Sequence, residues 1–479
     1  MTHKAPHPGR ANRVQSGMMI ELMQVVNSLG AARPIVLVGV AGLAVALGGG
    51  CRRPALAPAQ GPLCAPPPVT AKSITEKSGS ATGQLKDGDP AEQPPRPLRR
   101  CFPEQPAWVD APVADLLDKA ALLFDKGDYS GTLACAEEAA RAAPRSVEAH
   151  HNRAIALMRL DRLEEARDAL ELALALAPDD PETLEAAADL QVNQLPPSGD
   201  RSALGLEYAR RGSRHVPRRD VEEVARLALL EGQALIDLGR AAEALRRIDA
   251  ALVAQPHFGA AVYERGVALF ELCRFDEARA TFTKVLAETP DHAHALYHLG
   301  LIEERAGDEA AAARHLTAAT AADPKSFPPA PQITQPDFEA RVRRAVAALP
   351  ADFRRDISGV TVQAADLPDL EDLTAEKPPL SPTILGLFRG LPLDYDDQAA
   401  APTPAGRSRK GHAAPPPPSE SAPVQCDAGD RAIVLYRRNL LRTVKDGAEL
   451  DQAITRTLLH EVGHLRGEDD GSLRDRGLE

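Results

Sequence analysis

The stretch RLEEARDALELALALAPDD, residues 162–180, returns in altered form as RFDEARATFTKVLAETPDH at residues 274–292. Both stretches repeat apolar or small residues at intervals of three and four positions and then reach a proline. This spacing is typical of one buried face of a helix, and proline is a common stop signal just after a helix. The two stretches therefore predict a helical unit that recurs along the chain.

A series of prolines gives the period of this unit. They lie 34, 39, 39, 34 and 34 residues apart, at Pro144, Pro178, Pro217, Pro256, Pro290 and Pro324. A period of this length is typical of a solenoid, because one helix pair cannot bury its apolar stripe until a neighbouring pair stacks on it. We predict an all-α solenoid of about six units over residues 113–324. The third unit is degenerate and is stretched by NQLPPSG at 193–199.

Small residues recur at fixed places within the units. Twelve residues before the closing proline lie Thr132, Ala166, Ala244, Ala278 and Ala312. Small side chains allow two antiparallel helices to approach closely. The pattern resembles the tetratricopeptide repeat, which implies a concave groove that docks a peptide or protein. The alternative is a stabilising spacer that binds no ligand.

Two other features of this region concern possible ligands. In HAHALYH, residues 292–298, His294 and His298 share a helix face, but no acidic or thiol partner is close in sequence. We therefore expect a solvated helix face there, and no metal site. The six cysteines form no CxxC pair and show no spacing typical of a disulfide framework, so we expect Cys135 and Cys273 to pack as small core residues.

Composition and charge restrict the classes of partner. The net charge is −12, with acidic and basic residues interspersed, so no basic face is expected and nucleic acid is not an expected partner. Residues 52–107 are rich in proline and lack apolar periodicity, which predicts a disordered linker.

An apolar run without charge, residues 35–50, follows Arg33 and stops at Cys51. Residues 1–51 therefore resemble a bacterial lipoprotein signal, which implies export to the cell envelope and a lipid anchor on Cys51. The alternatives are an uncleaved membrane anchor, with the protein on the cytoplasmic side, and a buried helix.

The string KSFPPAPQITQ at 325–335 breaks the helical pattern, and we predict a small α+β domain over residues 336–479. It begins with a helix whose buried face carries Phe338, Val342, Ala345, Val346 and Leu349. Strand-like segments follow at 360–364, 383–393 and 431–441, with a disordered insertion at 397–428. A final helix is expected from Gly447 or Glu449 to Arg466.

This last helix carries the sequence HEVGH. His460 and His464 lie four residues apart, so both can reach one zinc ion from the same helix face, and Glu461 can act as general base. Gly467 permits a sharp turn that leads to Asp470, which stands where a third ligand is needed. Glu468 and Asp469 remain possible third ligands.

Four segments in this order resemble a bacterial family of small zincin-like metallopeptidases: EARVRRAVAALPADFR, ILGLFRGLPL, IVLYRRNLLR and TLLHEVGHLRGEDDGSLRDRG. The resemblance implies a minimal zincin fold that holds one Zn²⁺ through His460, His464 and Asp470 and hydrolyses peptide bonds. The alternative is an envelope scaffold with a structural or silent zinc site. We also consider the segment 431–441 as the edge strand that pairs with a substrate peptide, and Tyr436 and Arg389 as donors to the substrate carbonyl.

Overall fold

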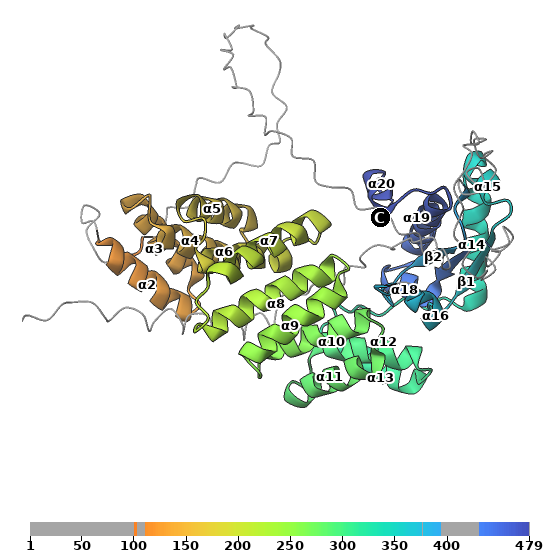
Figure 1. Cartoon of the computed structure of the whole chain (residues 1–479), viewed down its shortest axis with the longest axis horizontal. Coiled ribbons are helices and arrows are strands. Elements are labelled where there is room, and N and C mark those ends of the chain that lie inside the picture. The colour runs from red at the N-terminus through yellow and green to blue at the C-terminus, as the bar shows by residue number, and fades with distance from the viewer. Residues whose placement is uncertain (1–99, 103–110, 376, 394–430, 479) are drawn as a thin grey trace, which may run out of the picture. The chain divides into compact units, whose positions relative to one another are not determined.

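The computed structural model describes residues 100–102, 111–375, 377–393 and 431–478 (Figure 1). The predicted signal segment 1–51, all but three residues of the predicted linker 52–107, and the predicted insertion 397–428 lie outside these residues. No helix in the described ranges is both long enough and apolar enough to cross a membrane.

Six helical pairs form the solenoid, and in Figure 1 their colours run from orange at α2 to green at α13. Their helices are α2 (Val113–Asp125), α3 (Tyr129–Ala142), α4 (Val147–Arg159), α5 (Leu163–Leu176), α6 (Pro181–Asp189), α7 (Gly199–His215), α8 (Val221–Asp237), α9 (Ala241–Ala254), α10 (Gly259–Glu271), α11 (Phe275–Glu288), α12 (Ala293–Arg305) and α13 (Glu309–Ala322). In the third pair a π-helical turn, Leu190–Gln194, extends α6 into the longer connection that the sequence predicted. The prediction of a helical-repeat solenoid is confirmed.

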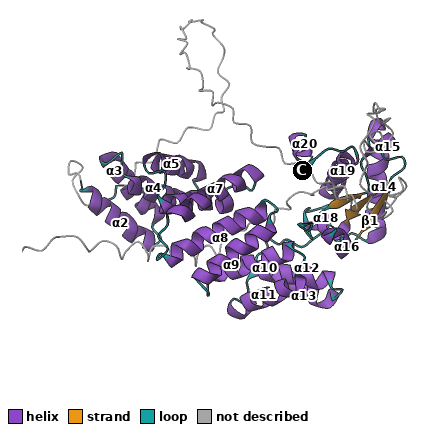
Figure 2. Ribbon diagram, in the orientation of Figure 1, coloured by secondary structure: helices purple, strands orange, loops and turns teal. Residues whose placement is uncertain are grey.

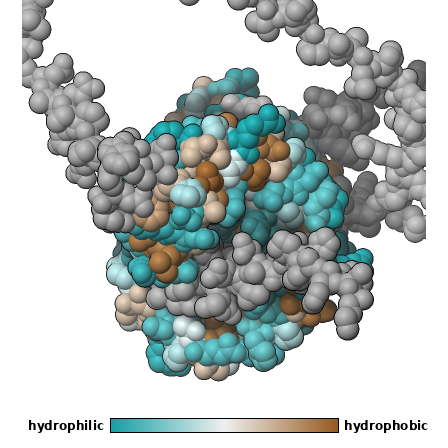
Figure 3. Space-filling view, turned by 90° about the vertical axis from the view of Figure 1, so that its left-hand side faces the viewer, coloured by the Kyte–Doolittle hydropathy of each residue, from teal (hydrophilic) through white to brown (hydrophobic). Residues whose placement is uncertain are grey.

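Small residues set the closeness of the helices within a pair. Ala166, Ala244 and Ala278 are completely buried. At Gly266 an added Cβ would lie 2.6 Å from the ring of Phe282, which shows that α10 and α11 touch through a position that tolerates no side chain. The face of the molecule in Figure 3 is mostly hydrophilic with scattered apolar residues, because many small and apolar side chains pack between the helices.

Two expectations for the solenoid are wrong. Cys135 is buried, but it forms a disulfide with Cys101, a residue that precedes the first helix. His298 does not lie on a solvated face: it is 7% exposed and stacks on Phe282 with 5.0 Å between ring centroids. Both errors arise because the contacting residues come from different helices or segments, which a single-helix pattern does not reveal.

The C-terminal domain is small and mixed, as predicted (Figure 2). Its elements are α14 (Gln335–Ala348), α15 (Ala351–Asp356), β1 (Thr361–Ala365), α16 (Leu370–Thr374), β2 (Gly386–Arg389), β3 (Ala432–Tyr436), α18 (Arg437–Arg442), α19 (Gly447–Leu465) and α20 (Asp470–Asp475). The three strands lie in the order β1-β3-β2, with β1 parallel and β2 antiparallel to β3.

This strand order corrects the prediction for residues 431–441. The strand ends at Tyr436, and α18 follows at once, anchored by the Asn439 side chain, which donates to the carbonyls of Pro382 and Ile384 at 3.1 and 2.8 Å. Since β3 pairs with a strand on both sides, it is the central strand and offers no free edge. The edges of the described sheet belong to β1 and β2.

Helix α19 packs on one face of the sheet and against α14. Phe338 and Val342 of α14 contact Leu450 and Ile454 of α19, which confirms the buried face predicted for this segment. Further along, α19 packs on strand residues such as Phe388. The helix is thus fixed from two sides, and so are the polar side chains near its C-terminal end.

Polar contacts connect the last repeat to this domain. Glu304 of α12 is buried and accepts hydrogen bonds from Arg442 and, at 2.8 Å, Arg438 of α18. Arg305 donates to the carbonyl of Pro368 at 2.6 Å. These groups are charged and mostly enclosed, so each needs its partner in place.

Candidate metal centre

Helix α19 positions three of the residues that the sequence singled out. Asp446 caps its start by accepting from the backbone N–H groups of Ala448 and Glu449 at 2.8 and 3.0 Å. The helix then runs for 19 residues without interruption, so His460 and His464 project from one face. Both rings are buried, at 2% and 4% exposure.

The two imidazoles and one carboxylate face a common point. The Nε2 atoms of His460 and His464 are 2.9 Å apart, and the Asp470 Oδ1 lies 3.7 and 3.3 Å from them. Two ligand atoms about 2.0 Å from a tetrahedral ion are about 3.3 Å apart, so these separations match those around a zinc ion. Among the described residues, this trio is the one group of His, Cys, Asp and Glu compact enough to hold a metal.

Backbone carbonyls orient both rings. The Nδ1 of His460 donates to the carbonyl of Leu478 at 2.7 Å, and the Nδ1 of His464 donates to the carbonyl of Glu468 at 3.0 Å. This assignment leaves both Nε2 atoms with lone pairs that face each other, an arrangement that a cation between them relieves. Burial opposes protonation of His460, but the Asp470 carboxylate, the charge of Glu461 and the Leu478 carbonyl together raise its pKa.

The turn after α19 decides which acidic residue joins the histidines. Gly467 adopts a φ of 84°, a left-handed conformation that glycine accepts without strain. Glu468 then pairs with Arg476 at 2.6 Å, and Asp469 caps α20 by accepting from the N–H of Ser472 at 2.8 Å. Asp470 alone of the three directs its carboxylate at the imidazoles.

Glu461 is completely buried beside this trio. Neither of its carboxylate oxygens accepts a hydrogen bond of normal geometry. Burial raises its pKa to about 7, although the two histidines and the nearby N–H of Phe388 act in the opposite direction. An unpaired carboxylate is costly to bury, so the position of Glu461 indicates a partner that belongs to the site.

Strand β2 lies against Glu461, and β3 is the one described strand that pairs with it; Gly386, Leu387 and Phe388 of β2 are buried. The N–H of Tyr436 donates to the carbonyl of Leu385 at 2.9 Å, so Leu385, Leu387 and Arg389 direct their backbone groups toward β3. Alternation along an antiparallel strand then directs the N–H and C=O groups of Gly386 and Phe388 outward. A Cβ on Gly386 would lie 2.9 Å from the Glu461 Oε1, so β2 runs directly past the carboxylate.

The Tyr436 hydroxyl is buried without a hydrogen-bond partner, and Tyr436 lies close enough to Glu461 to feel its charge. Tyr436 is fully buried in a cluster with Leu387 and Val434, and burial raises its pKa. Arg389 forms an ion pair with Asp372. The assignment of these two side chains as donors to a substrate carbonyl stays a prediction. Sequence analysis missed two features of the site: the close contact of Gly386 with Glu461, and the Leu478 and Glu468 carbonyls that orient the imidazoles. A backbone carbonyl is present in every residue, so no sequence pattern could have pointed to these two.

Comparison with known families agrees with this geometry. Residues 410–478 match the family model described as zincin-like metallopeptidase. The C-terminal domain is zincin-like. Tetratricopeptide repeats precede it, because residues 147–180, 229–288 and 272–327 match models of that repeat. No curated protein matches the chain.

Several solved structures of repeat proteins resemble part of the chain. PilF of Pseudomonas aeruginosa is 15% identical with a TM-score of 0.38, and the similarity covers 44% of this chain and 92% of that one. PilW, a type IV pilus biogenesis factor, is 20% identical with a TM-score of 0.39, covering 44% and 94%. YrrB, described as a tetratricopeptide protein with an unusual peptide-binding site, is 20% identical with a TM-score of 0.31, covering 40% and 93%. At these scores the similarity concerns helical repeats and carries no argument about function.

Proposed function

We propose that the chain is a zinc-dependent peptidase whose repeats recruit protein partners or substrates. One observation carries the proposal: three ligand atoms face a common point beside Glu461, a buried carboxylate with no hydrogen-bond partner. A purely structural zinc site has four protein ligands and no use for such a carboxylate, whereas a catalytic site has three ligands and an open position.

The residues of the site suit hydrolysis of a peptide bond. His460, His464 and Asp470 would hold the zinc ion, which when bound supplies a Lewis acid that polarises water and a peptide carbonyl. Glu461 accepts a proton from the attacking water on a carboxylate oxygen and later delivers it to the departing amine. The carbonyls of Leu478 and Glu468 hold the imidazoles in one tautomer and orientation throughout.

The substrate backbone pairs with β2. The N–H and C=O groups of Gly386 and the C=O of Phe388 face away from β3 and would pair with an extended peptide, and this strand runs directly past Glu461. The central position of β3 excludes it from this role. Pairing through the main chain makes few demands on substrate side chains, so selection of the substrate falls to the repeats.

Glu461→Gln tests the role of the carboxylate. The amide fills nearly the same volume but cannot accept the proton, so turnover of a cleavable peptide should fall by about 100-fold or more while bound zinc stays at the wild-type level. Glu449→Gln, in the first turn of the same helix, should change neither quantity. Turnover is read by mass spectrometry of a peptide mixture, and zinc by elemental analysis. If Glu461→Gln keeps wild-type turnover, the proposed role is wrong.

A hydroxamate inhibitor tests the open coordination position. It should bind the zinc-loaded protein tightly, because it can complete an open site, and binding should disappear with chelation. If the zinc-loaded protein does not bind it, the site is structural or silent. In that case the non-catalytic scaffold is the better account of the chain.

We propose further that the protein is exported and lipid-anchored at Cys51. The Cys101–Cys135 disulfide supports export, since structural disulfides persist mainly in oxidising compartments. Cys51→Ala should move the protein from the membrane fraction to the soluble fraction. If the variant stays with the membrane, an uncleaved anchor replaces the lipid anchor.

A further inference from the structure

The first helices of the repeats line one face of the solenoid. Helix α6 contacts α8, and α8 contacts α10, so these first helices pack directly on each other across repeats. In a helical-repeat solenoid the more closely packed row of helices lines the inner, concave face, where ligands are received. Side chains at the exposed positions of α6 and α8 therefore face any partner that enters.

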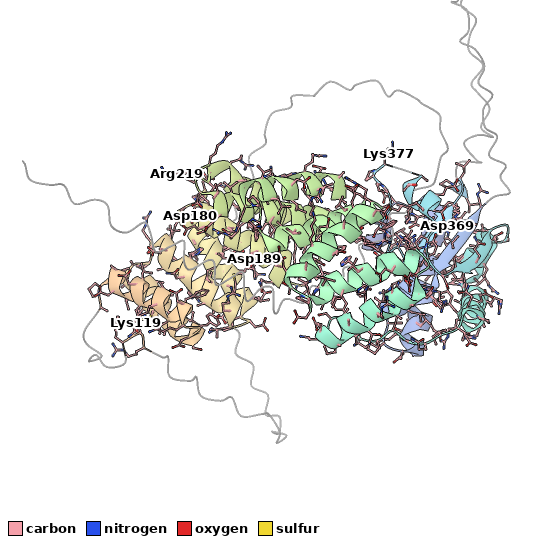
Figure 4. The ribbon with its side chains drawn as sticks, turned by 90° about the horizontal axis from the view of Figure 1, so that it is seen from below. Lys119, Asp180, Asp189, Arg219, Asp369 and Lys377 are labelled. Carbon is pink, nitrogen blue, oxygen red and sulfur yellow. A yellow bond between two sulfur atoms is a disulfide. The ribbon has the colours of Figure 1, made fainter. Side chains whose placement is uncertain are left out.

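This face carries a concentration of carboxylates between α6 and α8. Figure 4 labels Asp180 and Asp189, which bound α6. Some of these acidic side chains have ordinary structural roles, because Asp180 and Asp220 cap the two helices by accepting from the N–H groups of Thr183 and Glu223 at 3.0 and 3.3 Å. Helix N-termini favour negative charge, so these two aspartates need no ligand to explain them.

The glutamates of the cluster are not caps. Glu185 forms an ion pair with Arg226 at 2.8 Å. Glu182 is exposed on the same face of α6, one turn before Glu185. Glu223, one turn before Arg226 on α8, completes a group of three carboxyl groups around a single guanidinium.

Glu223 is the residue that separates this cluster from a solvated acidic surface. It is only 5% exposed, and its Oε1 is buried without a hydrogen-bond partner. Burial raises its pKa to about 8, and the charges of Glu185, Glu182 and Asp220 add to this effect while Arg226 opposes it. Such a group gains most from an incoming cation, because the cation supplies both the missing hydrogen bond and the compensating charge.

We propose that Glu182, Glu185 and Glu223 form a receptor for a lysine or arginine side chain of a protein partner laid along the inner face between α6 and α8. A bare metal ion does not suit the site, because within the described ranges only the trio at α19 and α20 is compact enough to hold one. An ammonium or guanidinium group on a flexible stem reaches carboxylates that stand further apart. This inference rests on the proposed recruitment of partners by the repeats and names the chemistry of what they recruit.

The test uses the full-length chain with Glu461→Gln, so that bound peptides are not cut. The probes are fluorescent nonapeptide pools that are randomised over uncharged residues and carry a central lysine, arginine or glutamine. Fluorescence anisotropy should show that the lysine and arginine pools bind about tenfold or more tightly than the glutamine pool. Adding Glu223→Gln or Glu182→Gln should remove this preference, whereas Glu222→Gln, an equal charge change on the neighbouring exposed residue, should keep it.

Stability separates a binding role from a structural one. If Glu223 serves recognition, Glu223→Gln should leave the midpoint of chemical denaturation at pH 8 unchanged or raised, because it removes an acid that is costly to ionise. A fall in that midpoint together with loss of binding would make Glu223 a structural residue. Equal binding of the three pools by the parent chain would overturn the receptor.

The result for the proposed receptor can be distinguished from the result for the proposed peptidase activity. If the lysine preference is present but the wild-type chain cuts no peptide, the catalytic proposal fails and the receptor stands. If the chain cuts peptides but shows no preference at Glu223, the receptor alone is wrong.

Discussion

At the scale of single residues, the site depends on what surrounds Glu461 as much as on the proposed metal ligands. Its carboxylate lies between the histidines and Gly386. Because Gly386 has no side chain, the Glu461 Oε1 fits beside its Cα. A residue that contributes only a missing Cβ is easily overlooked in a sequence. It nevertheless determines where the proposed proton acceptor stands, and small displacements of such a group lower the rate strongly.

Gly386→Ala should therefore reduce kcat by about tenfold or more with little change in KM, and should leave zinc content unchanged. The new methyl group would lie 2.9 Å from the Glu461 Oε1 and 2.8 Å from the Thr457 Cγ2, so both must shift. Adding Thr457→Ser relieves the second contact alone. The double variant should regain thermal stability without regaining kcat, and a full recovery of kcat would show that Gly386 acts only through packing.

Asp470 can be tested against the two ways of replacing it. Asp470→Asn keeps the shape but loses the negative charge, and zinc affinity should fall by about 100-fold or more. Asp470→His supplies a neutral nitrogen ligand at the same place and should retain tighter binding than the asparagine variant. Competition with a chromophoric chelator measures both. Equal zinc affinity of wild type and Asp470→Asn would remove Asp470 from the ligand set.

At the scale of elements, α10, α11 and α12 pack together around the imidazole of His298, a polar ring in an otherwise apolar core. His298 of α12 stacks on Phe282 and donates through Nδ1 to the carbonyl of His294 at 2.8 Å. Burial lowers its pKa to about 4; the neighbouring His294 and His292 act in the same direction, and the hydrogen bond to the His294 carbonyl opposes them. The ring is therefore neutral in the folded chain.

This burial predicts a loss of stability in acid. The folded pKa lies below the usual 6.5, so the unfolded chain binds the proton first, and stability falls as pH drops from about 6.5 toward 4. His298→Phe keeps the stacking and removes the titration. Chemical denaturation at pH 7 and pH 5 should show that this variant loses less stability than the wild type, by on the order of 2 kcal/mol. An equal loss in both chains would place the acid sensitivity elsewhere.

At the scale of the whole molecule, the disulfide ties the segment before the solenoid to its first helical pair. Cys101 and Cys135 are 34 residues apart, and the bond closes a loop that includes all of α2. Loss of the bond enlarges the unfolded ensemble, so Cys101→Ser with Cys135→Ser should reduce the stability of the first repeat by about 2 to 4 kcal/mol. Reductant should have the same effect on the wild type and none on the variant. A wild-type chain insensitive to reductant would show that the first repeat does not depend on the bond.

The sequence by itself determined the features that depend on neighbours in the chain. The repeat period, the small residues between paired helices and the HEVGH spacing were all readable, because a helix places residues three and four apart on one face whatever the rest of the molecule does. The turn at Gly467 was readable for the same reason. Spacing along the chain favoured Asp470 as the third ligand, but it left Glu468 and Asp469 possible.

Contacts between distant segments were decided by the tertiary structure alone. The central place of β3, the end of that strand at Tyr436, the disulfide of Cys135 and the burial of His298 each depend on a partner from elsewhere in the chain. So does the direction of the Asp470 carboxylate toward the imidazoles, while Glu468 and Asp469 are engaged by Arg476 and Ser472. Local spacing limits which side chains can meet, but only packing decides which of them do.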